Sequence, residues 1–337
     1  MVDKIETIIN NMLLIDKQDF GKKINGILKE IKQALENNKE AILKANKIDL
    51  KNENGFLIDF EIINKILGNA SEETIWYGKV ICSQRDIDKK IIYGKQIMDI
   101  GNVVVITDGN PYVLIEMMIR NILAGNTTIF ANNGFMYGVN QLLVQIIQEV
   151  LEQFKISKEL VQIYVTQNYD EILNNYANID LVVVIGNWEL QRLIIEKSKI
   201  KTITSGYENF EIYVENQKHN EFIKKIMKTG LNVQVYMRED LKLDYPDVLL
   251  VVDLEEAIAK INYNGSRYST AIFTESPDNA AKFIREIKAK IVTVNASPTI
   301  ERLIDIKQTD LVCEKTIIYP LSNKFNKDVY MVNLNKE

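Results

Sequence analysis

Cysteine and histidine, which most often bind metals or carry covalent catalysis, are almost absent from this sequence. The 337 residues include two cysteines, Cys82 and Cys313, and one histidine, His219. A zinc-type site needs three or four clustered ligands of these kinds, so the sequence predicts no metal site. Two cysteines provide no disulfide framework and favour a reducing, cytoplasmic setting. His219 lies in the polar stretch ENQKHNEF, where we expect a surface residue rather than a member of a catalytic triad.

Long apolar runs and an excess of positive charge are also missing. No segment approaches the roughly 20 apolar residues of a membrane span, and the charged N-terminal stretch does not read as a signal peptide. The 41 basic and 46 acidic residues give a net charge of −5 without a basic stripe. We therefore expect neither a membrane nor a nucleic acid as a partner.

Proline is scarce, and no low-complexity linker divides the chain. Only five prolines occur in 337 residues. Because this length is typical of two domains, we expect two domains that pack closely rather than two tethered ones.

What the sequence does contain is a regular alternation of apolar strands and amphipathic helices. After N-terminal helices, Val/Ile-rich strands are expected at 102–107, 127–131, 161–165 and 180–186, with helical patterns between them. Such runs predict an α/β fold with a doubly wound parallel sheet, which binds ligands outside the carboxyl ends of its strands. A hairpin is expected at about 86–102, with its tip at Tyr93-Gly94.

A second αβ series begins near residue 209 and ends near residue 297, and no internal repeat is evident. Between its helix DLEEAIAKINY and its strand TAIFT stands the pair Asn264-Gly265. Asn-Gly favours a tight turn because both residues tolerate a positive φ, so we interpret this loop as a chain reversal rather than a ligand site.

General nucleotide-binding motifs are absent. No G-x-G-x-x-G follows a predicted strand, and no G-x-x-x-x-G-K-[ST] occurs.

Several longer stretches nevertheless resemble one known family. ITDGNPYV, LAGNTTIFANNG, INYNGSRYSTAIFTES and VTVNAS follow one another in the order and surroundings of motifs in the aldehyde dehydrogenase superfamily, most closely in its gamma-glutamyl phosphate reductases. The resemblance runs over nearly the whole chain. It implies an aldehyde dehydrogenase-like fold, NAD(P) as cofactor, and reduction of an acyl phosphate through a cysteine thioester, or aldehyde oxidation by the reverse route.

The family's nucleophilic cysteine has no counterpart here. The family places it after a Tyr-Val-Asp strand, whereas EIYVENQKHNEFIKKIMKTGLNVQVYM passes from that strand into a helix and the next strand. Cys82 and Cys313 do not align with it, and we interpret both as incidental thiols. The whole nucleophile segment is missing rather than substituted.

Other positions of the family's site are altered as well. Tyr112 stands where the resemblance places the oxyanion amide. Asn132 lies at the end of the cofactor strand, where the family has an Arg-Gly-Gly-Ser type sequence, so the arginine that would face a phosphate is missing. Asn187 and Trp188 replace glycine-rich cofactor contacts, and Ser205 follows Thr204 in place of a Glu-His pair. We predict that Tyr112, Asn132, Asn187 and Trp188 border the old inter-domain cleft, as ligand contacts or as filling.

Two functions remain open at this point. The first is a catalytically degenerate homologue that serves as a binding or structural subunit, for which we expect no cofactor. The second is an NAD(P)-dependent oxidoreductase acting on an aldehyde or acyl phosphate, with Cys313 as its weak candidate nucleophile. We expect a Rossmann-like domain at 1–208, a reduced second domain at 209–305 and a tail at 306–337 that returns to the hairpin. The resemblance implies a homodimer.

Overall fold

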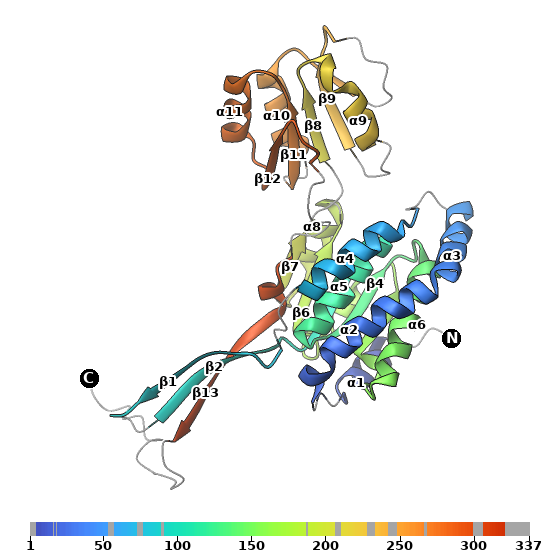
Figure 1. Cartoon of the computed structure of the whole chain (residues 1–337), viewed down its shortest axis with the longest axis vertical. Helices are drawn as coiled ribbons and strands as arrows, with labels where there is room; N and C mark the ends of the chain where they lie inside the picture. Colours follow the sequence, from blue (N-terminus) through green and yellow to red (C-terminus); the bar gives the residue numbers. More distant parts are fainter. Residues whose placement is uncertain are drawn as a thin grey trace.

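The structure is a computed structural model with three sheets. It describes residues 5–320 except 16, 18, 53–56, 73–76, 89–90, 187, 206–209, 228–232, 242–247, 266–267 and 299–305. Two α/β bodies lie one above the other in Figure 1, and a thin antiparallel sheet extends away from the lower one. We call the body that precedes residue 206 the first unit, residues 210–298 the second unit, and the antiparallel sheet the arm.

The first unit is built on a five-stranded parallel sheet. Its strands, in spatial order, are β5 (Val161–Val165), β4 (Thr127–Asn132), β3 (Asn102–Thr107), β6 (Leu181–Ile185) and β7 (Thr202–Ser205). All residues of β4 and β6 are buried, as expected for a parallel sheet that is covered on both faces. This architecture confirms the predicted doubly wound fold class.

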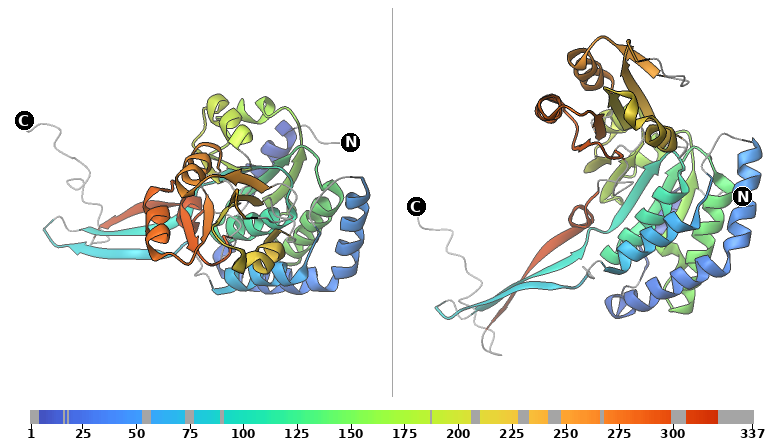
Figure 2. Two further views of the ribbon diagram at one scale, coloured as in Figure 1. Left: turned by 90° about the horizontal axis from the view of Figure 1, so that it is seen from above. Right: turned by 45° about the horizontal axis from the view of Figure 1, so that its top comes forward.

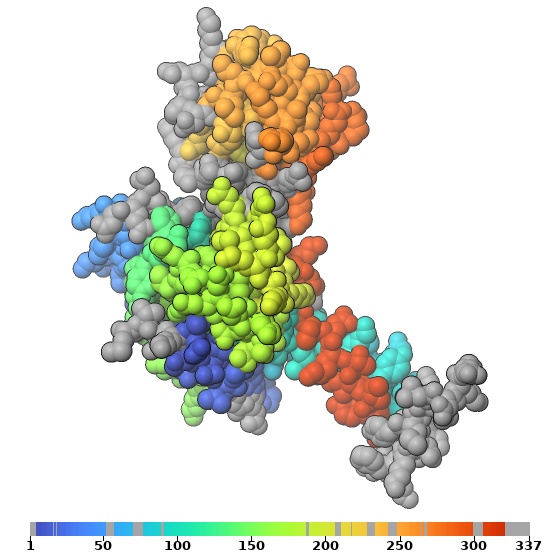
Figure 3. Space-filling model, turned by 180° about the vertical axis from the view of Figure 1, so that it is seen from behind, coloured from blue at the N-terminus to red at the C-terminus, as the bar shows by residue number. Residues whose placement is uncertain are grey.

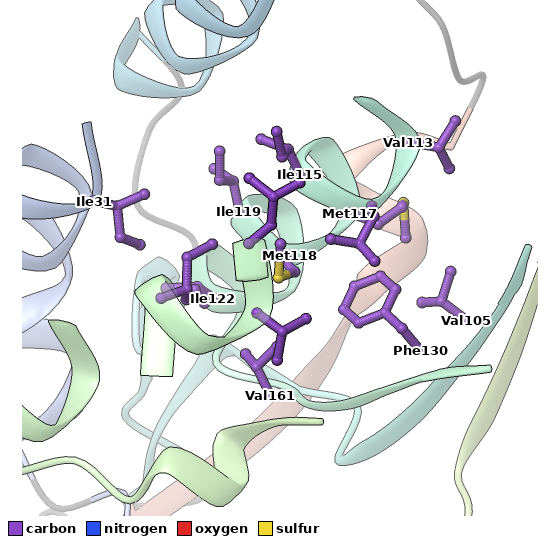
Figure 4. Packing of buried hydrophobic residues seen from close by; sticks show 14 of the residues in the cluster. Ile31, Val105, Val113, Ile115, Met117, Met118, Ile119, Ile122, Phe130 and Val161 are labelled. Atoms are coloured by element: carbon purple, nitrogen blue, oxygen red, sulfur yellow. The ribbon is translucent and has the colours of Figure 1, made fainter. Parts of the chain in front are cut away.

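Helices cover both faces of this sheet. One face packs against α2 (Phe20–Asn37), α3 (Lys39–Asn52), α4 (Phe60–Glu72), α5 (Pro111–Ala124) and α6 (Tyr137–Gln153). The other face packs against α1 (Ile5–Met12), α7 (Asp170–Leu173) and α8 (Trp188–Lys197). Helix α5 is buried all round, and Figure 4 shows its Met117 beside Phe130 of β4 and its Ile122 on the side of Ile31 of α2. The core of the first unit is centred on α5.

The second unit repeats the same topology. Its parallel strands are ordered β10 (Val248–Val251), β9 (Val233–Arg238), β8 (Phe210–Val214), β11 (Ser269–Phe273) and β12 (Ile291–Val294). Helix α9 (Asn220–Met227) covers one face, and α10 (Leu254–Asn264) and α11 (Pro277–Glu286) cover the other. In both sheets the first strand of the series lies in the centre, although the sequence shows no repeat.

The arm consists of β1 (Val80–Asp86), β2 (Ile91–Asp99) and β13 (Val312–Pro320), with β2 in the middle. Figure 2 shows it projecting from the first unit in both views. The predicted hairpin tip at Tyr93-Gly94 is wrong, because both residues lie inside β2 and pair with Gln84 and Ser83. The alternating pattern continues through them, and the chain reverses between Asp86 and Ile91.

Short 3-10 helices complete the described elements: η1 (Lys158–Leu160), η2 (Gln217–His219) and η3 (Gln308–Leu311). The last of these leads into β13 and is fixed to α5, because the Gln308 side chain donates to the carbonyl of Arg120 at 2.9 Å.

The Asn264-Gly265 pair does reverse the chain, but not through the conformation expected. Asn264 is the last residue of α10, and Gly265 is its C-cap with φ −72°, which is not a positive φ. A Cβ on Gly265 would lie 2.4 Å from the carbonyl oxygen of Ile261. Glycine is therefore required here by close approach rather than by a left-handed backbone.

Among the helices of the described residues, none combines the length and the apolar character needed to cross a membrane.

Candidate ligand site at the carboxyl edge of the first sheet

The loop after β3 forms the centre of the carboxyl edge. The Thr107 hydroxyl accepts a hydrogen bond from the Gly109 amide at 3.3 Å, and the Asp108 carboxylate accepts one from the Asn110 amide at 3.2 Å. Gly109 has φ +98°, and a Cβ there would lie 2.4 Å from the carbonyl oxygen of Phe135. Both the backbone and the space therefore require glycine, and the two loops after β3 and β4 are in direct contact.

Three buried asparagines converge on this loop contact. Asn110 caps α5 by accepting from the Tyr112 amide, and Asn132 at the end of β4 accepts from the Gly134 amide, each at 2.9 Å. Asn140 of α6 donates to the Gly109 carbonyl at 2.6 Å. Among the described residues, one side-chain atom of each has no hydrogen-bond partner: Nδ2 of Asn110, Nδ2 of Asn132 and Oδ1 of Asn140. The edge thus offers two amide donors and one amide acceptor.

The N-terminus of α6, which follows β4, is already occupied by a carboxylate. Asp49 of α3 accepts a hydrogen bond from the Val139 amide at 2.9 Å. A Cβ on Gly138 would lie 2.7 Å from the same carboxylate, so Gly138 makes room for it. A carboxylate is favourable at the positive end of a helix dipole, where phosphate groups also bind.

A groove of about 760 Å³ lies beside this edge, between α6 and the edge strand β5. Apolar side chains such as Ile8 and Ile163 line it together with four glutamines, Gln141, Gln145, Gln148 and Gln162, and no lining residue is charged. Its upper end reaches Gly134 and Val165, at the carboxyl ends of β4 and β5. The groove has the volume and the apolar-polar mixture of a small-molecule site.

The predicted cleft residues do not form one group. Tyr112 is buried in the core, where its hydroxyl donates to the Leu57 carbonyl at 2.9 Å and accepts from the Asp59 amide at 2.6 Å. Burial raises the pKa of this phenol. Asn132 lies at the edge described above, Asn187 lies outside the described residues, and Trp188 begins α8.

Both cysteines lie in the arm. Cys82 on β1 pairs with Lys95 of β2, and Cys313 on β13 pairs with Met98. The Cys313 thiol donates to the Asp99 carbonyl at 3.1 Å. His219 belongs to the second unit, where its ring lies 5.2 Å from that of Phe273. Neither sulfur and no imidazole lies among the residues that form the groove or the asparagine cluster.

Two carboxylates, those of Asp49 and Asp108, lie at this edge. Burial raises the pKa of Tyr169, and the Asp108 carboxylate raises it further. No group of three or more potential metal ligands occurs within the part of the chain that the structure describes.

Two contributors to the edge, Asp49 and Asn140, were not expected from the sequence. Asn140 did leave a signal, since it is a polar residue next to Val139 on the buried side of α6. Asp49 left none, because its role depends on how α3 packs against α6.

Comparisons with known proteins show which sequences this chain is similar to. No family model matches the sequence. The gamma-glutamyl phosphate reductase of Petrotoga mobilis is 25% identical over 338 residues, covering 80% of this chain and 81% of the relative. That of Dictyoglomus thermophilum is 24% identical over 366 residues, covering 88% of each.

Solved structures give the same picture at the level of the fold. The gamma-glutamyl phosphate reductase of Thermotoga maritima has a TM-score of 0.63 at 16% identity, covering 96% of this chain and all of the other (100%). The NADP-complexed glyceraldehyde-3-phosphate dehydrogenase of Methanocaldococcus jannaschii has a TM-score of 0.66 at 15% identity, covering 94% of each. These findings confirm the resemblance: the chain has the fold of the aldehyde dehydrogenase superfamily, and its sequence is similar to those of gamma-glutamyl phosphate reductases.

Proposed function

We propose that this protein is a catalytically degenerate relative of the gamma-glutamyl phosphate reductases that binds a small molecule or serves as a structural subunit. The observation that carries this proposal is the place of the two sulfurs. Cys82 and Cys313 lie on β1 and β13 of the arm, and a thioester route requires a thiol beside the cofactor and the substrate carbonyl. Loss of a covalent nucleophile removes the route itself rather than slowing it.

The cofactor implied by the fold family fits this edge poorly. A dinucleotide pyrophosphate is usually bound by free amides at the N-terminus of the helix after a strand, often with a nearby cation. At α6 the Val139 amide already donates to Asp49, and Asp108 adds a second carboxylate to the edge. The groove residues supply no positive charge. We infer a ligand that is neutral and partly apolar, and we derive no step through NAD(P).

Titration with NADH and NADPH tests this proposal. The binding signal is the heat measured by isothermal titration calorimetry, which needs no reporter residue at the binding site. We expect no saturable change up to millimolar dinucleotide. Saturation at micromolar concentrations would contradict the proposal.

The alternative is an NAD(P)-dependent oxidoreductase acting on an aldehyde or acyl phosphate such as glutamate-5-semialdehyde or gamma-glutamyl phosphate. Its support is the similarity to proteins named gamma-glutamyl phosphate reductase. In this chain it would need Cys313, an exposed thiol, as its nucleophile. Turnover that disappears on thiol alkylation would favour this function.

We further propose that two copies associate through the arm. Its outer strands carry exposed apolar side chains, among them Val80, Ile318 and Tyr319. Figure 3 shows the arm strands standing clear of the body when the molecule is seen from behind. A three-stranded sheet without a packed face is marginally stable alone, so a second copy would supply its missing cover.

The domain limits remain part of the proposal. We infer a first domain ending near residue 208, a second ending near residue 305, and a tail whose strand β13 pairs with β2. The two unpaired cysteines fit a reducing, cytoplasmic setting.

A further inference from the structure

The carboxyl edge of the second sheet contains a polar cluster that the proposed function does not use. The central strands β8 and β11 are neighbours, and Val214 pairs with Phe273 at their ends. The helix after β8 covers one face of the sheet, whereas the helix after β11 covers the other. The connections therefore diverge between β8 and β11, which is the position where parallel α/β sheets bind ligands.

Glu215 stands at this point and is held in place from two sides. Its carboxylate accepts hydrogen bonds from the hydroxyl of Thr274, which follows β11, and from the side chain of Asn279 in α11. Its own amide donates to the Phe273 carbonyl at 2.9 Å. No cation pairs with it among the ion pairs of the described residues, so its negative charge is available to a ligand.

Tyr213, two residues earlier on the same face of β8, supplies an unused donor. Its side chain is fully buried and stacks on Phe283, and its hydroxyl has no hydrogen-bond partner within the part of the chain that the structure describes. Burial, and next the Glu215 carboxylate, raise the pKa of this phenol, so it stays protonated. A buried donor without an acceptor is costly and points to a missing acceptor.

Opposite charges flank this hydroxyl. Arg238 ends β9 and pairs in register with Val251, the last residue of β10. Its Nε and Nη2 donate to Asp240, and no hydrogen bond of Nη1 occurs among the described residues, so Nη1 can donate to a ligand. Asp253 caps α10 by accepting from the Glu256 amide at 2.9 Å. An ion pair between Glu255 and Lys282 joins α10 to α11 over this face.

We propose that this edge binds a free α-amino acid. The carboxylate of the ligand accepts from the Tyr213 hydroxyl and the Arg238 guanidinium, and its ammonium group faces Glu215 and Asp253. A zwitterion matches both halves of the cluster, whereas a simple anion would meet the two acids and a simple amine would leave the Tyr213 hydroxyl without its acceptor.

This site is separate from the groove of the first unit. Residue 210 begins β8 five positions after β7 ends at residue 205, so the amino end of β8 lies toward the first unit. The cluster lies at the opposite, carboxyl end. Saturable binding of a dinucleotide would therefore contradict the proposed function but not this proposal. Lack of amino acid binding would contradict this proposal but not the proposed function.

The test measures the thermal stability of the full-length protein with each of the twenty proteinogenic amino acids at 5 mM, followed by calorimetric titration of those that stabilise it. We expect at least one stabilising amino acid, whose affinity falls about tenfold or more in Tyr213→Phe. Tyr236→Phe is the matched control, because Tyr236 pairs with Tyr213 on the same face. Burial, and next the Glu211 carboxylate toward the other end of β8, raise the pKa of Tyr236.

The apo form of Tyr213→Phe is expected to melt at or above the wild-type temperature, since it loses only an unpartnered hydroxyl. Asp253→Asn keeps the capping oxygen and gives a second, independent reduction in affinity. The proposal is overturned if no amino acid raises the melting temperature, if both variants bind like wild type, or if ethanolamine binds as tightly as the amino acid.

Discussion

Single residues near the first carboxyl edge make their polar contacts within the protein. Tyr112 is the clearest case. Its hydroxyl joins α5 to the chain at Leu57 and Asp59 instead of reaching toward a ligand. Asp49 likewise satisfies the α6 N-terminus from within the protein. Both side chains are therefore bound within the protein.

Gly109 and Gly68 give a matched pair of predictions at this scale. Gly109→Ala should destabilise the protein by about 2 kcal/mol or more, because alanine strains the positive φ and meets Phe135. Gly68→Ala should stabilise it by about 0.5–1 kcal/mol, because α4 has open space there and alanine favours a helix. Melting temperatures of both variants check the prediction. Equal shifts, or shifts of the same sign, would contradict the described loop.

Elements are where the sequence is most informative. The strand predicted at 102–107 is β3, the one predicted at 161–165 is β5, and the helix DLEEAIAKINY is α10. Continuous Val/Ile runs and capped amphipathic helices carry their own local signal, so they could be read without a structure. The element order from β3 to β6 and that of the second unit followed from them, whereas α8 and β7 were not predicted.

What could not be read depends on contacts between distant segments. Tyr93-Gly94 looks like a turn locally, but pairing with β1 and β13 keeps it inside a strand. The seven-residue strand β1 was not expected, because the hairpin was expected to start near residue 86. Of the candidate site, Asn132 was predicted, whereas Asp49 and the groove depend on how α3, α6 and α1 pack.

The arm gives a prediction at the element scale. Ile318 and Tyr319 are adjacent on β13, so their side chains point to opposite faces, and both are exposed. The double variant Ile318→Lys/Tyr319→Lys should convert a dimer into a monomer, since it places a charge on each face. Light scattering coupled to size-exclusion chromatography gives the mass.

Leu14→Lys is the control for the arm variant, because Leu14 is an exposed apolar residue that lies outside the arm. It should leave the mass unchanged. A wild-type protein that is already monomeric, or a double variant that stays dimeric, would exclude the arm as the interface.

At the scale of the whole molecule, two topologically matching sheets bury several tyrosines whose phenols resist ionisation. Burial raises the pKa of six tyrosines: Tyr77, Tyr112, Tyr164, Tyr169, Tyr213 and Tyr236. Because the folded state holds these protons more tightly than the unfolded state, their contribution to stability is complete below about pH 10 and is lost as the pH rises above it.

Alkaline titration checks this sign. Absorbance near 295 nm should show part of the fifteen tyrosines ionising near pH 10 and the rest only as the protein unfolds at higher pH. Tyr213→Phe should remove one phenol from the late group. A single transition of all tyrosines near pH 10 in a protein that is still folded would contradict the described burial.

At the scale of the whole molecule, the chain has the fold of the aldehyde dehydrogenase superfamily. Its two sulfurs lie in the arm, and at the first carboxyl edge the Val139 amide of α6 donates to the protein's own Asp49. The most direct measurement follows the formation of NAD(P)H by its absorbance, with glutamate-5-semialdehyde, phosphate and NAD(P)+ supplied, and compares the wild type with Cys82→Ser/Cys313→Ser. We predict no turnover above the no-enzyme background in either protein. Turnover by the wild type that the double variant lacks would contradict a scaffold without thioester chemistry.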